Sequence, residues 1–253
     1  MSKWDSNQYL KFAEERKQPC IDLINRLEDN YNYILDLGCG PGNSTKNLKD
    51  KFPQAEIVGI DIDDNMLNRA NEDYPNIKFV KGNIPDSLAS LENNFDLIFS
   101  NACIHWIENQ RKLISDVYNK LNDNGVFAIQ IPLTQNSKLY KNLYALIDAK
   151  WSKLKSISNF HNLSVEAYYN ELIKNFQEIT IWETDYYHIL NSKSDIIEWY
   201  KGSGLRPYLQ ALNEKEQEAF LVDLKNMIDK NYQLLEDDKV FLIMPRLFFI
   251  AKK

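Results

Sequence analysis

The sequence predicts a doubly wound α/β domain built on a mostly parallel sheet, and three observations predict it. Short apolar runs alternate with helical patterns over the first 132 residues. The runs are nearly continuous in apolar residues, which is typical of parallel strands buried on both faces. The glycine turn Gly38–Gly42 directly follows the first run, at the position where open α/β sheets bind ligands. With 253 residues, of which 44% are hydrophobic, the chain fits one large domain, 1–253.

Five strands are expected in the first half, separated by helices. The expected strands are residues 33–36, 56–62, 77–80, 95–100 and 126–131. Asn43 or Ser44 can cap the first helix, which runs to about Lys51. The second helix carries Met66, Leu67 and Ala70 on one face, and the third carries a buried stripe of Leu113, Ile114, Val117 and Leu121. We expect Asn124 and Gly125 to end that third helix and Pro132 to close the fifth strand.

The second half of the chain has a different pattern of predicted secondary structure. Residues 138–175 are predicted to be helical, and residues 178–190 form a sixth strand. Ser192 with Asp195 and Asn213 with Glu216 match the capping-box pattern, which predicts helices ending near Gly202 and Tyr232. A strongly β-prone run closes the chain at 240–251. Pro245 interrupts this run and predicts a bulge, a bend or an edge at that point. The simplest arrangement is one domain with a helical cap or insertion.

Charge and composition exclude several classes of function. The chain has 30 Lys+Arg against 36 Asp+Glu, a net charge of -6, so no overall field would attract nucleic acid or an anionic membrane. Its three cysteines and three histidines are scattered and indicate neither a disulfide framework nor a metal site. No stretch approaches the roughly 18 apolar residues of a membrane span. We therefore expect a cytoplasmic protein that binds neither membrane nor nucleic acid.

The spacing of the glycines narrows the class of ligand. Dinucleotide sites use GxGxxG, whereas Gly38, Gly40 and Gly42 form GxGxG, which argues against NAD and FAD. Asp61 lies at the end of the second expected strand, where a carboxylate can accept both hydroxyls of a ribose. A ribose carboxylate without the pyrophosphate glycine indicates a nucleoside that lacks phosphates, and S-adenosylmethionine fits this description.

The segments DLGCGPGN, VGID and FDLIFSNACIHW resemble the class I S-adenosylmethionine-dependent methyltransferases. The resemblance extends over nearly the whole chain to the trans-aconitate 2-methyltransferases, through WDSNQYLKFAEER, GSGLRPYL at 202–209 and MPRLFFIA at 244–251. It implies a seven-stranded Rossmann-like sheet. It also implies N-terminal lid helices (1–30), a cofactor-binding half (31–132), and a substrate side with a helical insertion and closing strands (133–253).

The resemblance also implies roles for individual residues around S-adenosylmethionine and its product S-adenosylhomocysteine. Asp61 would bind the ribose diol, and Asn83 stands where the family usually has an acidic residue. The complete implied cofactor set is Asp36, Gly38, Gly40 and Gly42 at the methionine and ribose, Asp61 at the diol, Met66, Asn83 and Ile84 at the adenine, and Asn101 and Ala102 beside the transferring methyl.

Four residues are candidates for substrate binding, each with a structural alternative. Tyr9 belongs to an N-terminal helix that is either a lid over the cofactor or simply packed. His105 stands where the resemblance leads us to expect Gln. It either helps Asn101 to orient the substrate or is a structural residue at a helix start or at the edge of the core. Arg206 and Arg246 can grip carboxylates bidentately, or they can form structural ion pairs.

These observations lead to one principal hypothesis and three alternatives. The principal hypothesis is a monomeric carboxyl O-methyltransferase that forms a monomethyl ester of trans-aconitate or a related small polycarboxylate. A carboxylate is already ionised at neutral pH, so the reaction needs neither a general base nor a metal. One alternative is a methyltransferase for another small acid or a carrier-bound acyl chain. The others are a nucleic-acid methyltransferase, which the acidic charge disfavours, and a cofactor-binding regulator without catalysis.

Overall fold

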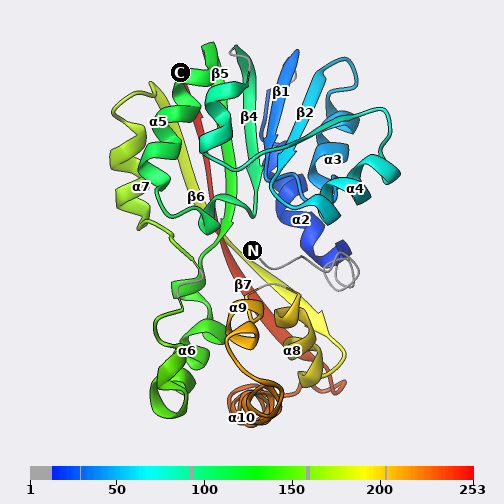
Figure 1. Cartoon of the computed structure of the whole chain (residues 1–253), viewed down its shortest axis with the longest axis vertical. Helices are drawn as coiled ribbons and strands as arrows, with labels where there is room; N and C mark the ends of the chain where they lie inside the picture. The colour runs from blue at the N-terminus through cyan, green and yellow to red at the C-terminus, as the bar shows by residue number, and fades with distance from the viewer. Residues whose placement is uncertain (1–12, 29, 92–93, 158–159, 203) are drawn as a thin grey trace.

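A computed structural model describes residues 13–28, 30–91, 94–157, 160–202 and 204–253. Its centre is a seven-stranded sheet in the order β3-β2-β1-β4-β5-β7-β6. β7 is antiparallel to both of its neighbours, and the other pairs are parallel. The expected α/β sheet is therefore confirmed (Figure 1). The strands are β1 (Tyr33–Leu37), β2 (Glu56–Asp61), β3 (Lys78–Lys81), β4 (Phe95–Asn101), β5 (Leu121–Pro132), β6 (Glu178–Leu190) and β7 (Val240–Lys252).

Helices cover both faces of this sheet because successive strand residues point to opposite sides. On β1, Ile34 packs in one cluster with Leu23 and Leu48, whereas Leu35 packs in another with Leu113. The helices of the first cluster are α2 (Ala13–Ile24) and α3 (Asn43–Lys51), and those of the second are α5 (Gln110–Lys120) and α7 (Val165–Leu172). α4 (Asp64–Asp73) follows β2 and buries Met66, Leu67 and Ala70, as the sequence predicts.

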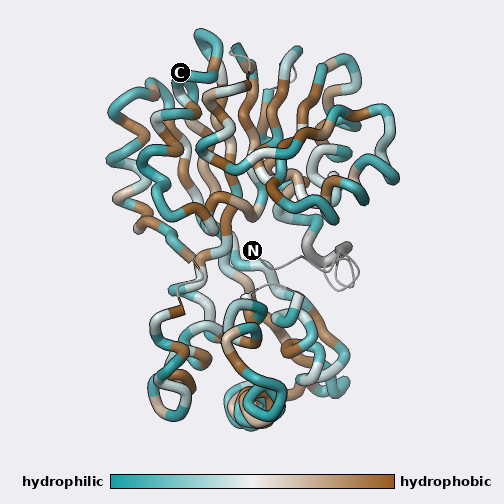
Figure 2. The backbone as a smooth tube through the Cα atoms, in the orientation of Figure 1, coloured by the Kyte–Doolittle hydropathy of each residue, from teal (hydrophilic) through white to brown (hydrophobic). Residues whose placement is uncertain are grey.

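A helical cap stands on the far ends of the last two strands. β6 and β7 are 13 residues each and extend past Pro132, where β5 ends. Four helices pack on this extension around a separate core that includes Trp199 and Phe220. Figure 1 shows them below the main sheet, and Figure 2 shows hydrophobic and hydrophilic residues interspersed along them. They are α6 (Lys138–Lys150), α8 (Lys193–Lys201), α9 (Arg206–Gln210) and α10 (Glu214–Asn231).

The predicted helix starts in the cap are confirmed. Ser192 and Asp195 form a reciprocal capping box at α8, and Asn213 and Glu216 form another at α10. The helical region predicted at 138–175 consists of α6 and α7 with a connecting segment between them. α7 packs on the main sheet and not in the cap, so the second half of the chain contributes to both layers.

Pro245 marks the end of a strand pairing. Its carbonyl accepts a hydrogen bond from the N–H of Leu133, one residue beyond the last β5–β7 pair, Pro132 with Arg246. In a strand the N and the C=O of a residue point to the same side. Pro245 therefore lacks an N–H donor on the side of β7 that faces β5, at the point where β5 ends. The edge predicted at Pro245 is thus confirmed, and pairing with β6 continues through it.

Two local predictions are wrong. α5 ends at Lys120 and not at Asn124 and Gly125, because Leu121 already pairs with Phe95 of β4 and begins β5. Gly42, and not Asn43 or Ser44, is the N-cap of α3, with φ of 87° and no side-chain cap. The Ser44 hydroxyl is used elsewhere, on Asp36.

No helix within the described ranges combines the length and the apolar character needed to cross a membrane.

Candidate functional site

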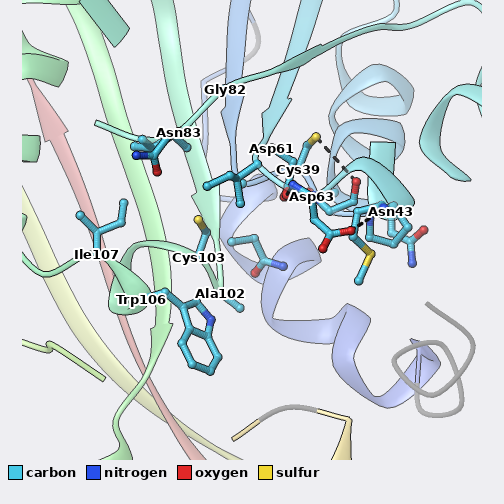
Figure 3. Close-up of a pocket in the computed structure, with 18 of the residues that line it drawn as sticks. Cys39, Asn43, Asp61, Asp63, Gly82, Asn83, Ala102, Cys103, Trp106 and Ile107 are labelled. Atoms are coloured by element: carbon cyan, nitrogen blue, oxygen red, sulfur yellow. Dashed lines mark hydrogen bonds between the residues drawn. The ribbon is translucent and has the colours of Figure 1, made fainter. Parts of the chain in front are cut away.

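A pocket of about 1080 Å³ opens at the carboxyl ends of β1, β2, β3 and β4, and the cap contributes to its wall. Its floor is the glycine turn after β1, its sides are the segments after β2, β3 and β4, and α9 of the cap contributes Arg206, Pro207 and Gln210. Figure 3 shows Asp61, Asn83 and Ala102, which come from three different strand ends, around this space. The cavity therefore lies where the sequence predicts a ligand site, at the glycine turn after the first strand.

The glycine turn is shaped by positive φ angles and by close packing. Gly38, Gly40 and Gly42 have φ of 70°, 54° and 87°, which residues with a Cβ rarely adopt. A Cβ on Gly38 would lie 2.0 Å from the Sγ of Cys103. Gly38 and Gly40 line the pocket. Gly42 does not, since its open side meets Tyr74, and its role is to begin α3.

Asp36 supports this turn from below and does not line the pocket. Its side chain is fully buried, and its Oδ2 accepts hydrogen bonds from the hydroxyls of Ser44 and Thr45, each at 2.7 Å. Burial raises the pKa of Asp36 to about 6, while the two hydroxyl hydrogen bonds act in the opposite direction. Asp36 thus ties the first turn of α3 to β1, and its role in binding the cofactor stays a prediction.

Asp61 lies in the pocket wall at the end of β2. Its Oδ2 accepts from the backbone N–H of Gly40, and its Oδ1 accepts from the N–H of Asp63, both at 2.9 Å. Burial raises the pKa of this carboxyl, and these backbone hydrogen bonds oppose the rise. The carboxylate is thereby held in one orientation beside the glycine turn, as a ribose-binding group requires.

The residues expected at an adenine come from α4, which carries Met66, and from the segment after β3, which carries Asn83 and Ile84. Met66, Asn83 and Ile84 all line the pocket. Asn83 is held by two hydrogen bonds to Ser87 and one to Asp86. The structure thus brings the three expected residues to the same cavity.

Asn101 and Ala102 line the pocket at the end of β4. The Oδ1 of Asn101 is buried, and no hydrogen bond from the described residues reaches it. Ala102 has φ of 52°, and a strained backbone at such a point is typical of a functional turn. The sequence places both residues correctly at this strand end.

Arg206 is the substrate candidate that the structure brings to the pocket. It begins α9 and lines the cavity, as Asp63 does. Burial lowers the pKa of Arg206, and Asp63 opposes the shift; a guanidinium in such a setting stays charged at neutral pH. A cation of the cap therefore lies at the wall of the same cavity as Asp61.

His105 and Arg246 lie behind the pocket wall and not in it. Both are buried, and neither lines the cavity. Burial and then the charge of Arg246 hold the pKa of His105 well below its ordinary value, so the imidazole is neutral. Its ring packs against Trp106 and Phe160. The packing of His105 fits the alternative of a residue at the edge of the core, and its role in orienting the substrate stays a prediction.

Two tyrosines, Tyr140 and Tyr186, lie within electrostatic range of Arg246 at the junction of sheet and cap. Arg246 acts electrostatically on Tyr140 and Tyr186 as well as on His105. The rings of Tyr140 and Tyr200 meet edge to face, with their centroids 4.8 Å apart. The junction is therefore rich in hydrogen-bond donors around one cation.

Some site features were missed from the sequence, and one expected residue cannot be placed. Asp63 lines the pocket and caps α4, and its position just before that helix is a recognisable N-cap signal. Cys20, Cys39 and Cys103 also line the pocket, which their spacing in the sequence does not indicate. Tyr9 lies outside the described residues. Among those described, no cluster of His, Cys, Asp or Glu could hold a metal ion.

Comparison with known proteins identifies relatives of the whole chain. Residues 28–194 match the family described as "Methyltransferase domain". The trans-aconitate 2-methyltransferase of Shigella dysenteriae serotype 1 (strain Sd197) is 37% identical, over 100% of this chain and 99% of its own. The enzyme of the same name from Escherichia coli (strain SE11) matches with the same identity and coverage.

Solved structures share the fold at low sequence identity. The YcgJ protein of Bacillus subtilis has a TM-score of 0.59 at 14% identity, and the match covers 95% of this chain and 98% of that chain. Phosphoethanolamine N-methyltransferase 2 of Haemonchus contortus, in complex with S-adenosyl-L-methionine, has a TM-score of 0.53 at 18% identity, with 98% of this chain and 52% of that chain covered.

Proposed function

The chain belongs to the class I methyltransferases and, within them, to the trans-aconitate 2-methyltransferase family, and from this membership we propose that it is a carboxyl O-methyltransferase. Its methyl donor is S-adenosylmethionine, and its product is a monomethyl ester of trans-aconitate or of a closely related polycarboxylate. The full-length relatives carry the name of this activity. The residues that line the pocket support this activity as well.

The residues of the pocket fit the methyl donor. The open space above Gly38 and Gly40 admits the methionine part close to the main chain. Asp61 presents a fixed carboxylate to the ribose hydroxyls, and Asn83 and Ile84 lie at the side expected for adenine. Asn101 and Ala102, which line the pocket at the end of β4, would lie beside the transferring methyl. The unpartnered Oδ1 of Asn101 is a further group that a bound ligand could satisfy.

The observation that carries the substrate class is the position of Arg206. It belongs to α9 of the cap and lines the same cavity as Asp61 and the glycine turn. A planar guanidinium binds a carboxylate with two parallel hydrogen bonds. A protein with a net charge of -6 needs such a local cation to hold a polyanionic acid. Arg246, with its phenol neighbours, would act on a second carboxylate from behind the wall.

The main requirement of the reaction is that the donor methyl and the substrate carboxylate are aligned. When bound, the donor supplies an electrophilic methyl on its sulfonium; the substrate carboxylate forms the new O–C bond as the S–C bond breaks, which leaves S-adenosylhomocysteine and the ester. The carboxylate is ionised at neutral pH, so no residue has to remove a proton. Asn101 and Arg206 would orient the reactants, and exclusion of water with correct orientation can supply on the order of 7–11 kcal/mol.

The decisive experiment is transfer of labelled methyl to a panel of acids, scored as base-labile ester. Trans-aconitate, cis-aconitate, citrate, isocitrate and simple dicarboxylates would be compared at equal concentration. Arg206→Ala should raise KM for the preferred acid by about 10- to 100-fold, the range for loss of a charge-assisted hydrogen bond. Lys201→Ala, on the neighbouring cap helix and paired with Glu198, is the matched control.

The outcomes of this experiment test the substrate class and the role of Arg206 separately. A preference for trans-aconitate that depends on Arg206 supports the proposal. Unchanged KM in Arg206→Ala contradicts the assigned role of this arginine. Donor binding without any ester would overturn the acid as substrate and favour a carrier-bound acyl chain or another small molecule. The expectations of a cytoplasmic, monomeric enzyme that does not bind nucleic acid stay predictions.

A further inference from the structure

The turn after β3 holds Asn83 through its backbone. The N–H of Asn83 donates to the Oγ of Ser87 at 2.8 Å, and its carbonyl accepts from the N–H of Ser87 at 2.7 Å. Both backbone polar groups of Asn83 are thus used within the turn. The side chain is the part of Asn83 that remains for a ligand, and the residue lines the pocket.

The side chain of Asn83 is itself oriented by a neighbour. Its Nδ2 donates to the Oδ2 of Asp86 at 3.1 Å. A carboxylate accepts hydrogen bonds and cannot donate them, so the amide must turn its NH₂ group toward Asp86. Its Oδ1 then points away from Asp86. Asp86 also lines the pocket.

We propose that Asp86 is a positioning residue for base selection: it fixes the Asn83 amide so that the pocket offers an acceptor to the 6-position of a purine. A 6-amino group donates a hydrogen bond to that oxygen. A 6-oxo group would place two acceptors against each other. This inference rests on the proposed function, in which the pocket holds an adenosine-type methyl donor.

The proposal predicts an effect on selectivity more than on affinity. Without the Asp86 carboxylate the amide can rotate by half a turn and offer its NH₂ group to a 6-oxo purine. Adenine would lose little because the rotation is optional, whereas hypoxanthine would gain a partner. A residue that merely supported the turn would change both affinities together.

The test compares two ligands on the whole chain by isothermal titration calorimetry. The ligands are S-adenosylhomocysteine and its 6-oxo analogue, S-inosylhomocysteine. In Asp86→Ala the ratio of the two Kd values should fall by about tenfold, the size expected for one neutral hydrogen bond. Asp86→Asn keeps an acceptor oxygen and should retain most of the ratio.

Asp64→Ala is the matched control. Asp64 is a nearby surface carboxylate that pairs with Lys81 at 2.6 Å and does not line the pocket. Its loss should leave the ratio unchanged. An unchanged ratio in Asp86→Ala, or an equal loss of affinity for both ligands, would overturn the role of Asp86. If the unsubstituted chain binds neither ligand, the proposed cofactor fails instead, so the two failures are distinguishable.

Discussion

The Oδ2 of Asp61, at the end of β2, accepts a hydrogen bond from the backbone N–H of Gly40 at 2.9 Å. This contact joins the carboxyl ends of two neighbouring parallel strands across 21 residues of sequence. It fixes the carboxylate and the glycine turn relative to each other before any ligand enters. The four predictions below follow from this arrangement and from the groups around it.

Asp61→Asn should weaken binding of the methyl donor. The substitution keeps the size of the side chain but removes its charge, and hydrogen bonds to a charged group contribute about 1.5–3 kcal/mol. We expect the Kd for S-adenosylhomocysteine to rise about 10- to 100-fold, measured by calorimetry. Glu56→Gln, at the opposite end of β2, is the control. An unchanged Kd in Asp61→Asn would contradict the ribose role.

Gly38→Ala should destabilise the fold more than Gly40→Ala. Both positions have positive φ, which costs a residue with a Cβ about 1–2 kcal/mol. Only at Gly38 would the new Cβ collide with Cys103; at Gly40 nothing lies within 4 Å. Overpacking adds about 1–3 kcal/mol. Urea unfolding should therefore show a larger loss for Gly38→Ala, and equal losses would refute the collision.

Asp36→Asn should change how stability depends on pH. The folded-state pKa of Asp36 is raised from 3.8 to about 6, so the folded chain binds a proton that the unfolded chain releases. The stability contribution of this group is fully present below about pH 4 and is lost as the pH rises through about 6.

Relative to Asp36→Asn, the natural chain should thus become less stable by about 2–3 kcal/mol between pH 4 and pH 7. Chemical unfolding of both chains at intervals across this range measures the difference. If the difference in the free energy of unfolding is constant with pH, Asp36 does not titrate as the structure indicates.

Arg246→Lys should weaken binding of the acid and leave donor binding intact. Lysine keeps the charge but loses the planar guanidinium, which at this buried position would act on the acid only through the residues that form the pocket wall. We expect KM for the acid to rise about tenfold, as for one lost hydrogen bond, with an unchanged Kd for S-adenosylhomocysteine. Arg69→Lys, in an exposed pair with Asp73, is the control. An equal rise in KM for the acid and in Kd for S-adenosylhomocysteine would indicate a purely structural role for Arg246.

Features that depend on neighbours in sequence could be predicted from the sequence alone. The strand–glycine–helix pattern, the capping boxes at Ser192 and Asn213 and the edge at Pro245 are local, and all are present. The end of α5 was mispredicted because the turn signal at Asn124 and Gly125 is overridden by pairing of Leu121 with β4. Sheet pairing is a contact between distant segments, which no local signal contains.

The sequence by itself therefore determined the fold class, the glycine turn and Asp61, since each depends on residue type and order along one strand or turn. Tertiary structure alone decided which side chains share the cavity. Arg206 reaches the pocket because β6 and β7 carry the cap beyond Pro132, whereas Arg246 and His105 are buried behind the wall. Such placements arise from packing between segments far apart in the chain, and the physical reason is that burial is settled by the whole fold and not by spacing.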